Sequence, residues 1–413
     1  MNSLAAERDA PLADAPRLRV ALVGDYPPAE DAIHEGGIQS VTFALAHALA
    51  RRTDIECHVI CSTRDARTRY RRVGELHVHY APRLPLPRLV TCRIHDVPSL
   101  VPVIRSINPD IVHGQGQDRH SLAALRAGLP TVITPHGVFF IESRMLQRNR
   151  FDLLGMLKKR LVNSMEEEVF RRASDMVIIS RYLPEIYGPM LSARPHFIEN
   201  PINEEFFHVP RTPQPGRLLF VGTVVPRKCI PDLVRAVSLV VQSPGERGTQ
   251  LPWRARLQLR IAGPVLDPGS KTLILRTIEE CEVGAHVTFC GALSQSELLS
   301  EYSNAQALLL ASREETTPQV IAQAMACGLP SISSAVGGVP HMVRDGTTGL
   351  LFPFGDVRSC ANQITRLLDN DSLREAMTAR ISAEARQRFH PDSVADQTLT
   401  VYRQALARVR TRS

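Results

Sequence analysis

The residues with the clearest capacity for chemistry lie in an acidic turn and in the helix predicted to follow it. The turn reads Glu314-Glu315-Thr316-Thr317-Pro318. Proline is tolerated in the first turn of a helix, where its missing N–H costs least, and Gly328-Leu-Pro330 would end the helix. The pattern therefore predicts a helix from about Pro318 to Ala326. Its first N–H groups lack internal partners and lie at the positive end of the helix dipole, so they can hold an anion.

The spacing of Glu315 and Gln323 along this helix indicates what could fit beside it. At about 1.5 Å of rise per residue, the eight positions between them correspond to about 12 Å on similar sides of the helix. A nucleotide sugar has a similar reach from its hexose to its ribose. The alternative is an ordinary buried αβ unit with two solvated acids, because acidic residues before helices are common. Spacing alone favours that alternative.

A double glycine and a histidine at the end of a strand add two candidate positions. Gly36-Gly37 follows the apolar run from Leu18 to Gly24 and precedes a helical pattern, so its backbone N–H groups could approach a phosphate closely. His136, in Thr134-Pro-His136-Gly137, closes a predicted strand, and ligands in open α/β sheets bind at the carboxyl ends of strands. A plain turn and a structural histidine are the respective alternatives.

Two adjacent cations follow the first predicted strand of the second half. Arg227 and Lys228 end the segment Val221-Gly222-Thr-Val-Val-Pro-Arg227-Lys228. From a loop at the carboxyl end of a strand, they could reach a diphosphate bound between two domains. A basic surface loop is the alternative.

Short apolar runs alternate with helical patterns along both halves of the chain, which indicates βαβ units and parallel sheets. At 413 residues the chain exceeds the usual size of a single core, and Pro210 to Pro215 is its best linker. We expect a disordered leader over 1–16, a first domain over 17–205, a linker over 206–216, a second domain over 217–390 and a final helix over 391–413. Strands are expected near 18–24, 56–61, 77–80, 111–113, 131–134, 176–180, 218–222, 256–263 and 286–290, and helices near 152–173, 230–241, 273–281, 359–369 and 391–408.

Composition and charge restrict the chemical classes of possible partners but do not identify one. Apolar residues make up 44% and charged residues 22%, as in ordinary globular proteins. The net charge of +7 and the pI near 9.1 favour anionic partners, whether phosphorylated ligands, nucleic acid or an anionic membrane. The run from Arg64 to Arg72 concentrates cations; we interpret it as a solvated loop rather than as a membrane-binding patch.

Several classes of site are not signalled. The eight cysteines form no C-x-x-C pair, so buried reduced thiols are expected rather than a disulfide framework or a zinc ribbon. His77 and His79 share one face of a predicted strand, but no carboxylate or cysteine stands at ligand spacing, so no metal site is expected. No uninterrupted apolar stretch approaches the length of a membrane span, and no secretory signal precedes Arg17.

Taken in order, the motifs resemble the large family of retaining, nucleotide-sugar-dependent glycosyltransferases with the GT-B fold, known as group 1 or family four. The match runs from Arg17 to about Arg408. The motifs that carry it are Gly36-Gly37, Thr134-Pro-His136-Gly137, Asn200-Pro201-Ile202, Phe220-Val-Gly222 through Lys228, Ile261-Ala-Gly263, Val287-Thr-Phe-Cys-Gly291, Glu315 with Ala324-Met-Ala-Cys-Gly-Leu-Pro330, and Val336-Gly-Gly-Val-Pro340 with Asp345-Gly-Thr-Thr-Gly349.

The resemblance implies an α/β protein with two Rossmann-like domains whose parallel sheets face a cleft. It implies that the donor is bound mainly by the second domain and the acceptor mainly by the first, and that the final helix crosses back to the first domain. It implies transfer of a hexosyl unit from a nucleotide diphosphate sugar to a glycan, glycolipid or small-molecule acceptor. It also implies no metal and no cofactor other than that co-substrate. The expected location is cytoplasmic, either free or at the inner face of the membrane, with no nucleic-acid partner.

The resemblance also assigns roles to single residues. It places Gly36 and Gly37 at the donor diphosphate and His136 beside the donor sugar. It makes Lys228, with Arg227, the counter-charge of the leaving diphosphate. It implies that Glu315 binds the hexose hydroxyls and that the main chain of Thr317 and Pro318 lies near sugar or phosphate. Gln323 occupies the position where a ribose-binding glutamate is usual.

Three positions depart from the family pattern. Thr223 stands where an arginine often accompanies the lysine, and our hypothesis is that Arg227 supplies that cation. Gln323 keeps a hydrogen-bond acceptor but loses the charge, which is worth about 1 kcal/mol or more. His341 stands where glutamate is common. Two alternatives stay open. One is a GT-B-type nucleotide-sugar epimerase, which would need additional acid/base residues near the sugar. The other is an inactive subunit that binds the donor, because Thr223 and Gln323 weaken the pattern.

Overall fold

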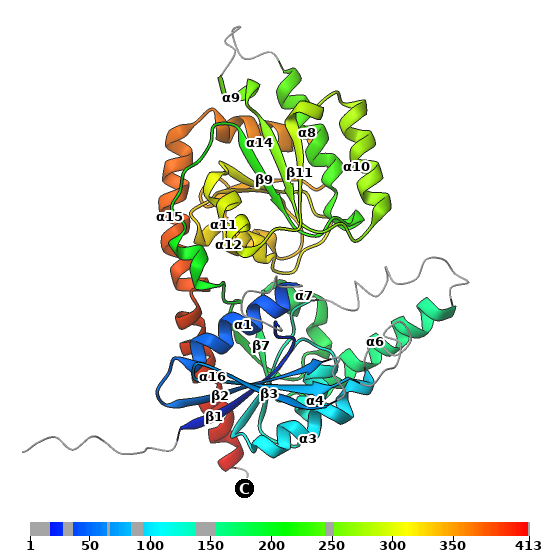
Figure 1. Ribbon diagram of the computed structural model, residues 1–413, viewed down its shortest axis with the longest axis vertical. Helices are drawn as coiled ribbons and strands as arrows, with labels where there is room; N and C mark the ends of the chain where they lie inside the picture. The colour runs from blue at the N-terminus through cyan, green and yellow to red at the C-terminus, as the bar shows by residue number, and fades with distance from the viewer. Residues whose placement is uncertain are drawn as a thin grey trace, which may run out of the picture.

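The computed structural model describes residues 17–27, 36–63, 67–83, 94–137, 153–243 and 252–411. The predicted leader over 1–16 lies outside these residues. Two open sheets lie one beyond the other along the long axis of the molecule, each with helices on its faces (Figure 1). The chain is therefore an α/β protein with two largely parallel sheets, as expected.

The first domain is built on an eight-stranded sheet with the order β3-β4-β2-β1-β5-β6-β7-β8. All neighbouring strands in it are parallel except β3 and β4. The strands are β1 (Leu18–Val23), β2 (Ile55–Thr63), β3 (Arg69–Val73), β4 (Leu76–Pro82), β5 (Ile111–Gln115), β6 (Thr131–Thr134), β7 (Asp175–Ile178) and β8 (Arg194–Phe197). The helices are α1 (Gly37–Ala50), α3 (Val97–Ile107), α4 (Arg119–Arg126), α6 (Leu153–Arg172) and α7 (Tyr182–Tyr187).

The second domain carries a six-stranded sheet with the order β11-β10-β9-β12-β13-β14, parallel throughout. Its strands are β9 (Arg217–Val221), β10 (Gln258–Ala262), β11 (Val287–Gly291), β12 (Ala307–Leu310), β13 (Ser331–Ser334) and β14 (Gly349–Phe352). Its helices are α8 (Ile230–Gln242), α9 (Pro252–Ala255), α10 (Pro268–Glu280), α11 (Gln295–Asn304), α12 (Gln319–Ala326), α13 (Val339–Met342), α14 (Val357–Leu368) and α15 (Asp371–Phe389), followed by α16 (Pro391–Arg410).

Buried apolar strands explain the layered arrangement of the first domain. Along β1, Ala21 and Val23 belong to the apolar cluster formed with α3, α4 and α6. Val20 and Leu22 belong to the cluster on the other face, formed with α1 and α16. Because successive side chains of a strand point to opposite faces, one uninterrupted apolar run supplies both layers.

The C-terminal helix α16 lies on the first domain although it follows the second domain in the chain. Figure 1 shows α15 running along the second domain and α16 continuing past the first. Tyr402 is fully buried, and its hydroxyl lies 2.6 Å from Nδ1 of His113 on β5. The end of the chain thus fastens the two domains on one side of the molecule.

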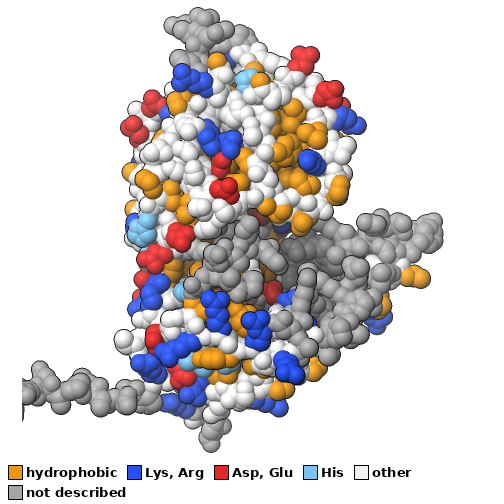
Figure 2. Space-filling model, in the orientation of Figure 1, with side chains coloured by type: hydrophobic (Ala, Val, Ile, Leu, Met, Phe, Trp, Pro, Cys, Tyr) orange, Lys and Arg blue, Asp and Glu red, His pale blue; other side chains and the backbone are white. Residues whose placement is uncertain are grey.

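The basic run near the N-terminal edge differs from the solvated loop that we expected. Residues 69–73 form β3, which pairs antiparallel with β4 at the sheet edge; residues 64–66 lie outside the described part. The pairing was missed because the side chains of Arg69, Arg71 and Arg72 are exposed and give no apolar alternation. Lys and Arg side chains gather on the first domain in Figure 2.

The two histidines of β4, His77 and His79, make structural contacts with a neighbouring strand. Nε2 of His79 lies 3.0 Å from Nδ1 of His58 on β2, and the ring of His77 stacks on that of His58. Burial, together with the neighbouring His58 and His77, lowers the pKa of His79 to about 4. No group of three metal-ligating side chains occurs among the described residues.

Helix α10 begins earlier than the sequence pattern indicated, at Pro268 rather than near Leu273. Asp267 caps it, since its carboxylate accepts a hydrogen bond of 2.7 Å from the N–H of Ser270. Among the described helices, none combines the length and the apolarity needed to cross a membrane.

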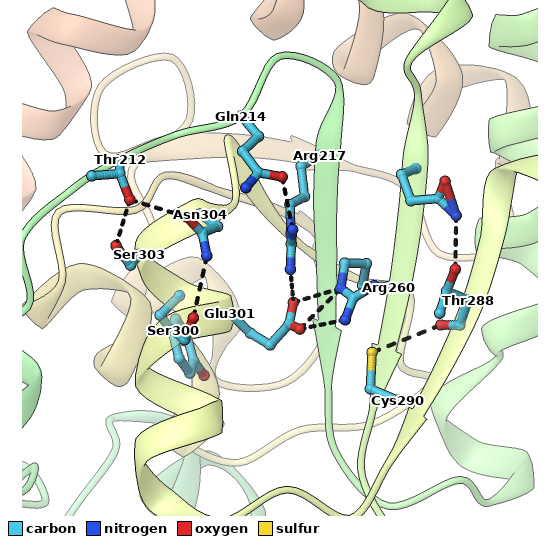
Figure 3. Close-up of polar contacts among 12 residues, drawn as sticks. Thr212, Gln214, Arg217, Arg260, Thr288, Cys290, Ser300, Glu301, Ser303 and Asn304 are labelled. Atoms are coloured by element: carbon cyan, nitrogen blue, oxygen red, sulfur yellow. Dashed lines mark hydrogen bonds and ion pairs between the residues drawn. The ribbon is translucent and has the colours of Figure 1, made fainter.

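A buried carboxylate connects the first strands of the second sheet to α11. Figure 3 shows Arg217 and Arg260 converging on Glu301. Nε of Arg260 donates to the Glu301 carboxylate at 2.7 and 2.9 Å, and Arg217 donates at 2.9 Å. Burial acts to raise the pKa of Glu301, but the hydrogen bonds from the two arginines outweigh it and hold that pKa below its usual value.

Replacing Glu301 by glutamine is expected to lower the free energy of unfolding by about 3 kcal/mol, because two arginines lose their counter-charge in a partly buried site. Since the folded-state pKa is depressed, this stabilisation is present above the usual glutamate pKa and is lost as the pH falls below it. Urea unfolding at pH 7 and at pH 4 measures both effects. Glu280→Gln, which breaks an exposed pair with Arg276, is the control and should cost less than about 0.5 kcal/mol.

Candidate active site

A cavity of about 340 Å³ lies between the two domains. The first domain contributes the start of α1 and the turn after β6; the second contributes the turn after β9 and the acidic turn before α12. Seven of the candidate donor-site residues line this one cavity: Gly37, His136, Arg227, Lys228, Glu315, Thr317 and Pro318. Gly36, the N-cap of α1, and Gln323 are not part of the lining.

The two cations of the cavity share one carboxylate. Arg227 and Lys228 lie in a short 3-10 turn, Pro226–Lys228, directly after β9. Lys228 is 7% exposed, and its ammonium group forms an ion pair with Oε1 of Glu315. Arg227 approaches the same oxygen at 3.6 Å. Burial lowers the pKa of Lys228, and the attraction of Glu315 opposes that shift.

The acidic turn before α12 also contacts the first domain. Glu314 accepts a hydrogen bond of 2.6 Å from the hydroxyl of Tyr182, at the start of α7. Burial and the neighbouring Glu314 raise the pKa of the Tyr182 hydroxyl, so that it remains a donor. The adjacent carboxylates therefore have separate partners: Glu314 bridges the domains, and Glu315 balances the cations.

A tight glycine turn holds the acidic turn in place. Gly338 donates its N–H to the carbonyl of Glu315 at 2.8 Å. A Cβ atom on Gly338 would stand 1.8 Å from the carbonyl oxygen of Thr316, and one on Gly337 would stand 2.1 Å from that of Glu315. Only glycine permits this approach of one backbone to another.

The starts of two helices meet at the cavity. A Cβ atom on Gly37, the first residue of α1, would stand 3.3 Å from Cγ of Gln319, the first residue of α12. Gln319 also lines the cavity, and both its Oε1 and the Oγ1 of Thr317 are buried without a hydrogen-bond partner among the described residues. Gln319 carries no motif signal in the sequence, because its position gains significance only from the packing of α1 opposite it. Two positive helix ends and two cations thus surround one space.

His136 is held in a defined tautomer. Its Nε2 lies 2.7 Å from Oε1 of Gln115, and its backbone N–H donates to Oε1 of Gln117 at 3.2 Å. A carbonyl oxygen can only accept, so Nε2 carries the proton. The ring's Nδ1 is then an acceptor, and it is buried without a partner among the described residues. Burial lowers the pKa of His136 to about 4, so the ring is neutral at pH 7.

We expect nitrogen-15 NMR of labelled protein to show His136 protonated at Nε2 and bare at Nδ1, with a titration near pH 4. Because this pKa lies below the unfolded value of about 6.5, the neutral ring stabilises the fold above pH 6.5 and this contribution is lost as the pH falls towards 4. The exposed His208 serves as the solvent-accessible reference. A proton on Nδ1, or a titration near 6.5, would contradict this arrangement.

Gln323 does not line the cavity. Its side chain instead has a hydrogen-bond partner within the second domain. Its Oε1 accepts a hydrogen bond of 2.9 Å from the hydroxyl of Tyr302, which is fully buried. The side-chain carbonyl is therefore already occupied. A role for Gln323 at a ligand stays a prediction, and any contact with a ligand would come from the amide N–H₂ group.

The other two departures from the family pattern fall on different sides of the acidic turn. Thr223 lines the cavity together with Arg227; that Arg227 supplies the missing cation stays a prediction. His341 does not line it; it lies 3.7 Å from Glu185 of α7 and borders a second cavity.

Two family profiles match the chain in sequence order. The profile described as Glycosyltransferase Family 4 matches residues 35–206, and the profile described as Glycosyl transferases group 1 matches residues 202–386. The first covers the domain with the eight-stranded sheet except for β1, and the second covers most of the other domain.

Among curated relatives, the D-inositol 3-phosphate glycosyltransferase of Nocardioides sp. is 34% identical over 202 residues, 47% of this chain and 42% of that protein. The chain therefore matches less than half the length of this relative. Among solved structures, the sucrose-phosphate synthase of Thermosynechococcus elongatus gives a TM-score of 0.75 at 21% identity, with 95% of this chain and 100% of the other covered. Anabaena Alr3699/HepE in complex with UDP-glucose gives 0.66 at 16% identity, with 96% and 100% covered.

The structural likenesses extend over both domains and show a common fold. The profile matches name the same class for each half, and they meet at residues 202–206, between β8 and β9. The chain belongs to the family 4, group 1 glycosyltransferases, and its two-domain architecture is the GT-B fold.

Proposed function

We propose that the protein is a retaining glycosyltransferase that moves a hexosyl unit from a nucleotide diphosphate sugar to a hydroxyl group of an acceptor. One observation carries this proposal: Arg227, Lys228 and the starts of α1 and α12 surround one cavity between the domains. This arrangement suits a diphosphate, because cations and free N–H groups stabilise the negative charge that develops as it leaves. The protein's own cations would act as its counter-charge.

The ion pair between Lys228 and Glu315 suggests how the contacts in the cavity would change when the donor binds. Both cations lie beside the Glu315 carboxylate. A diphosphate would offer the cations a stronger partner and so release Glu315, whose oxygens could then accept hydrogen bonds from hexose hydroxyls. The neutral His136, with Nδ1 as acceptor, would hold another sugar hydroxyl from the opposite wall.

Retention is the outcome that the resemblance to retaining glycosyltransferases implies. The described residues of the first domain that line the cavity are Gly37, Ile38, His136, Gly137 and Asn200, and none is a carboxylic acid. A carboxylate facing the sugar from that wall, as general base or as nucleophile in the manner of glycosidases, is not among them. The departing diphosphate itself would accept the proton of the acceptor hydroxyl.

A donor panel tests the proposal first. A ligand that binds only the folded state raises apparent stability, by about 2.7 kcal/mol at one hundred times its Kd. UDP-, GDP- and ADP-sugars are compared by thermal shift, and UDP-glucose is the first candidate because HepE binds it. We expect one nucleoside diphosphate series to raise the midpoint by several degrees and the matching monophosphate to do much less.

Turnover then distinguishes transfer from its alternatives. Release of the nucleoside diphosphate together with an α-linked product from an α-linked donor supports retaining transfer. D-inositol 3-phosphate is a suitable first small-molecule acceptor, since a 34% identical relative bears its name. Epimerised nucleotide sugar without any acceptor would instead indicate an isomerase, and binding without turnover over a broad acceptor panel would indicate an inactive subunit.

A further inference from the structure

A second cavity, of about 430 Å³, lies between the same two domains on the side of α15 and α16. Its walls come from the ends of β7 and β8, from the segment around α13, and from α15 and α16. The proposed roles of the donor residues leave this space unused. Thr317 lines both cavities, so the two spaces adjoin at that residue.

The acids of this second cavity are already neutralised. Glu199, which follows β8, accepts hydrogen bonds of 2.6 and 2.5 Å from Arg388 of α15. Glu384 accepts a hydrogen bond of 2.6 Å from the same Arg388 and is also paired with Arg344. This chain of ion pairs joins the first domain to α15, so the wall of the cavity exists only when the two domains are together.

One cation of the second cavity has no acid partner among the residues that the structure describes. Three arginines line it against two glutamates, which leaves one positive charge uncompensated. Arg344 and Arg388 are paired as described, whereas no ion pair or hydrogen bond joins the side chain of Arg181 to any residue in the described ranges. Its guanidinium lies 5.7 Å from the centre of the Phe197 ring, and Phe197 is 54% exposed.

These groups suit a particular kind of ligand. An exposed aromatic face packs well against the C–H groups of a sugar or polyol ring, and the amides of Gln387 and Gln397 can hydrogen-bond its hydroxyls. An unpaired guanidinium recognises a phosphate or carboxylate. The position of the second cavity next to the first matters as well, because a transferase must hold its two substrates next to each other.

We infer that this second cavity binds the acceptor, and that the acceptor is a sugar or polyol bearing an anionic group that pairs with Arg181. The inference rests on the proposed transferase function and names its substrate class. One acceptor hydroxyl would reach past Thr317 towards the donor. Its oxygen would form the new bond to the anomeric carbon as the bond from that carbon to the diphosphate oxygen breaks, and its proton would pass to the diphosphate.

The test measures binding by calorimetry in protein saturated with the nucleoside diphosphate, so that the donor site is filled. Glucose 6-phosphate and glucose form a pair of probes that differ only in the anion. We expect glucose 6-phosphate to bind at least tenfold more tightly than glucose. Arg181→Gln should abolish that difference and leave glucose unchanged, Arg181→Lys should keep part of it, and Phe197→Ala should weaken both probes by a similar factor.

The control is Arg386→Gln, which removes another arginine placed over a phenylalanine, at 5.8 Å from the ring of Phe207. It should leave both probes unaffected. Equal affinities of the two probes for the wild-type protein, or an unchanged preference in Arg181→Gln, overturn the inference. The same titrations also measure binding of the nucleoside diphosphate. If the diphosphate binds normally while the two probes do not behave as expected, only the inference about the acceptor is overturned. If the diphosphate itself does not bind, the result counts against the transferase proposal.

Discussion

Lys228→Ala is expected to lower turnover by about 100- to 1,000-fold, the usual cost of removing one group that stabilises charge in a transition state. The reason is that Lys228 is the most buried cation of the cavity and would face the leaving diphosphate. Arg227→Ala should have a smaller effect on turnover, because its side chain is 36% exposed and already partly solvated. Steady-state release of nucleoside diphosphate measures both.

Measurements of unfolding free energy distinguish the structural role of Lys228 and Glu315 from their chemical role. Lys228→Ala leaves the buried Glu315 with only the more distant Arg227, and Glu315→Ala leaves Lys228 unpaired, so each should cost about 3 kcal/mol of unfolding free energy. The double variant removes both charges and should cost clearly less than the sum of the two. It should remain as inactive as the worse single variant. Additive losses of stability would show that the two residues do not form a coupled pair.

Gly338→Ala is expected to abolish donor binding and to destabilise the protein by several kcal/mol. Its backbone lies in the right-handed helical region, where alanine is allowed, so the effect would come from packing alone. The added Cβ would stand 1.8 Å from the carbonyl oxygen of Thr316, and relief of that contact must displace the turn that carries Glu315. Thermal unfolding and nucleotide titration measure the two effects.

A matched glycine provides the control for that substitution. Gly284 has no atom within 4 Å of its hypothetical Cβ, so Gly284→Ala should change stability by less than about 1 kcal/mol and leave nucleotide affinity unchanged. Normal nucleotide binding by Gly338→Ala would show that the glycine turn does not position the acidic turn.

The elements that the sequence predicted well have strong local signals. Helix α12 was expected from 318 to 326 and spans Gln319–Ala326, because Pro318 and Gly328 mark its two ends. Strand β9, expected over 218–222, is Arg217–Val221, in which Leu218 to Val221 form a continuous apolar run with a buried centre.

Two of the elements that were missed, β13 and α15, lack such signals. Strand β13 reads Ser331-Ile332-Ser333-Ser334; it is fully buried yet mostly polar, so it carries no apolar pattern. Helix α15 places only Met377, Ile381, Ala385 and Phe389 in the core, at helical spacing within an otherwise charged segment.

The candidate site was predictable as a set of motifs but not as a set of contacts. Lys228 and Glu315 stand 87 positions apart in the chain, and their pairing depends on the order of β9 and β12 in the sheet. Likewise, the contact of Tyr182 with Glu314 depends on how the two domains meet, which no local pattern contains. Tertiary placement also gave Gln323 its partner Tyr302, although spacing alone set it on the same side as Glu315.

The most direct measurement is a calorimetric comparison of the nucleoside diphosphate selected by the donor panel with the corresponding monophosphate, in the wild-type protein and in Arg227→Ala/Lys228→Ala. Arg235→Gln, an exposed arginine on α8 paired with Asp232, is the control. We predict that the wild type and the control bind the diphosphate at least tenfold more tightly than the monophosphate, and that the double variant loses this preference. An undiminished preference for the diphosphate in the double variant would contradict the assignment of this cavity as the donor site.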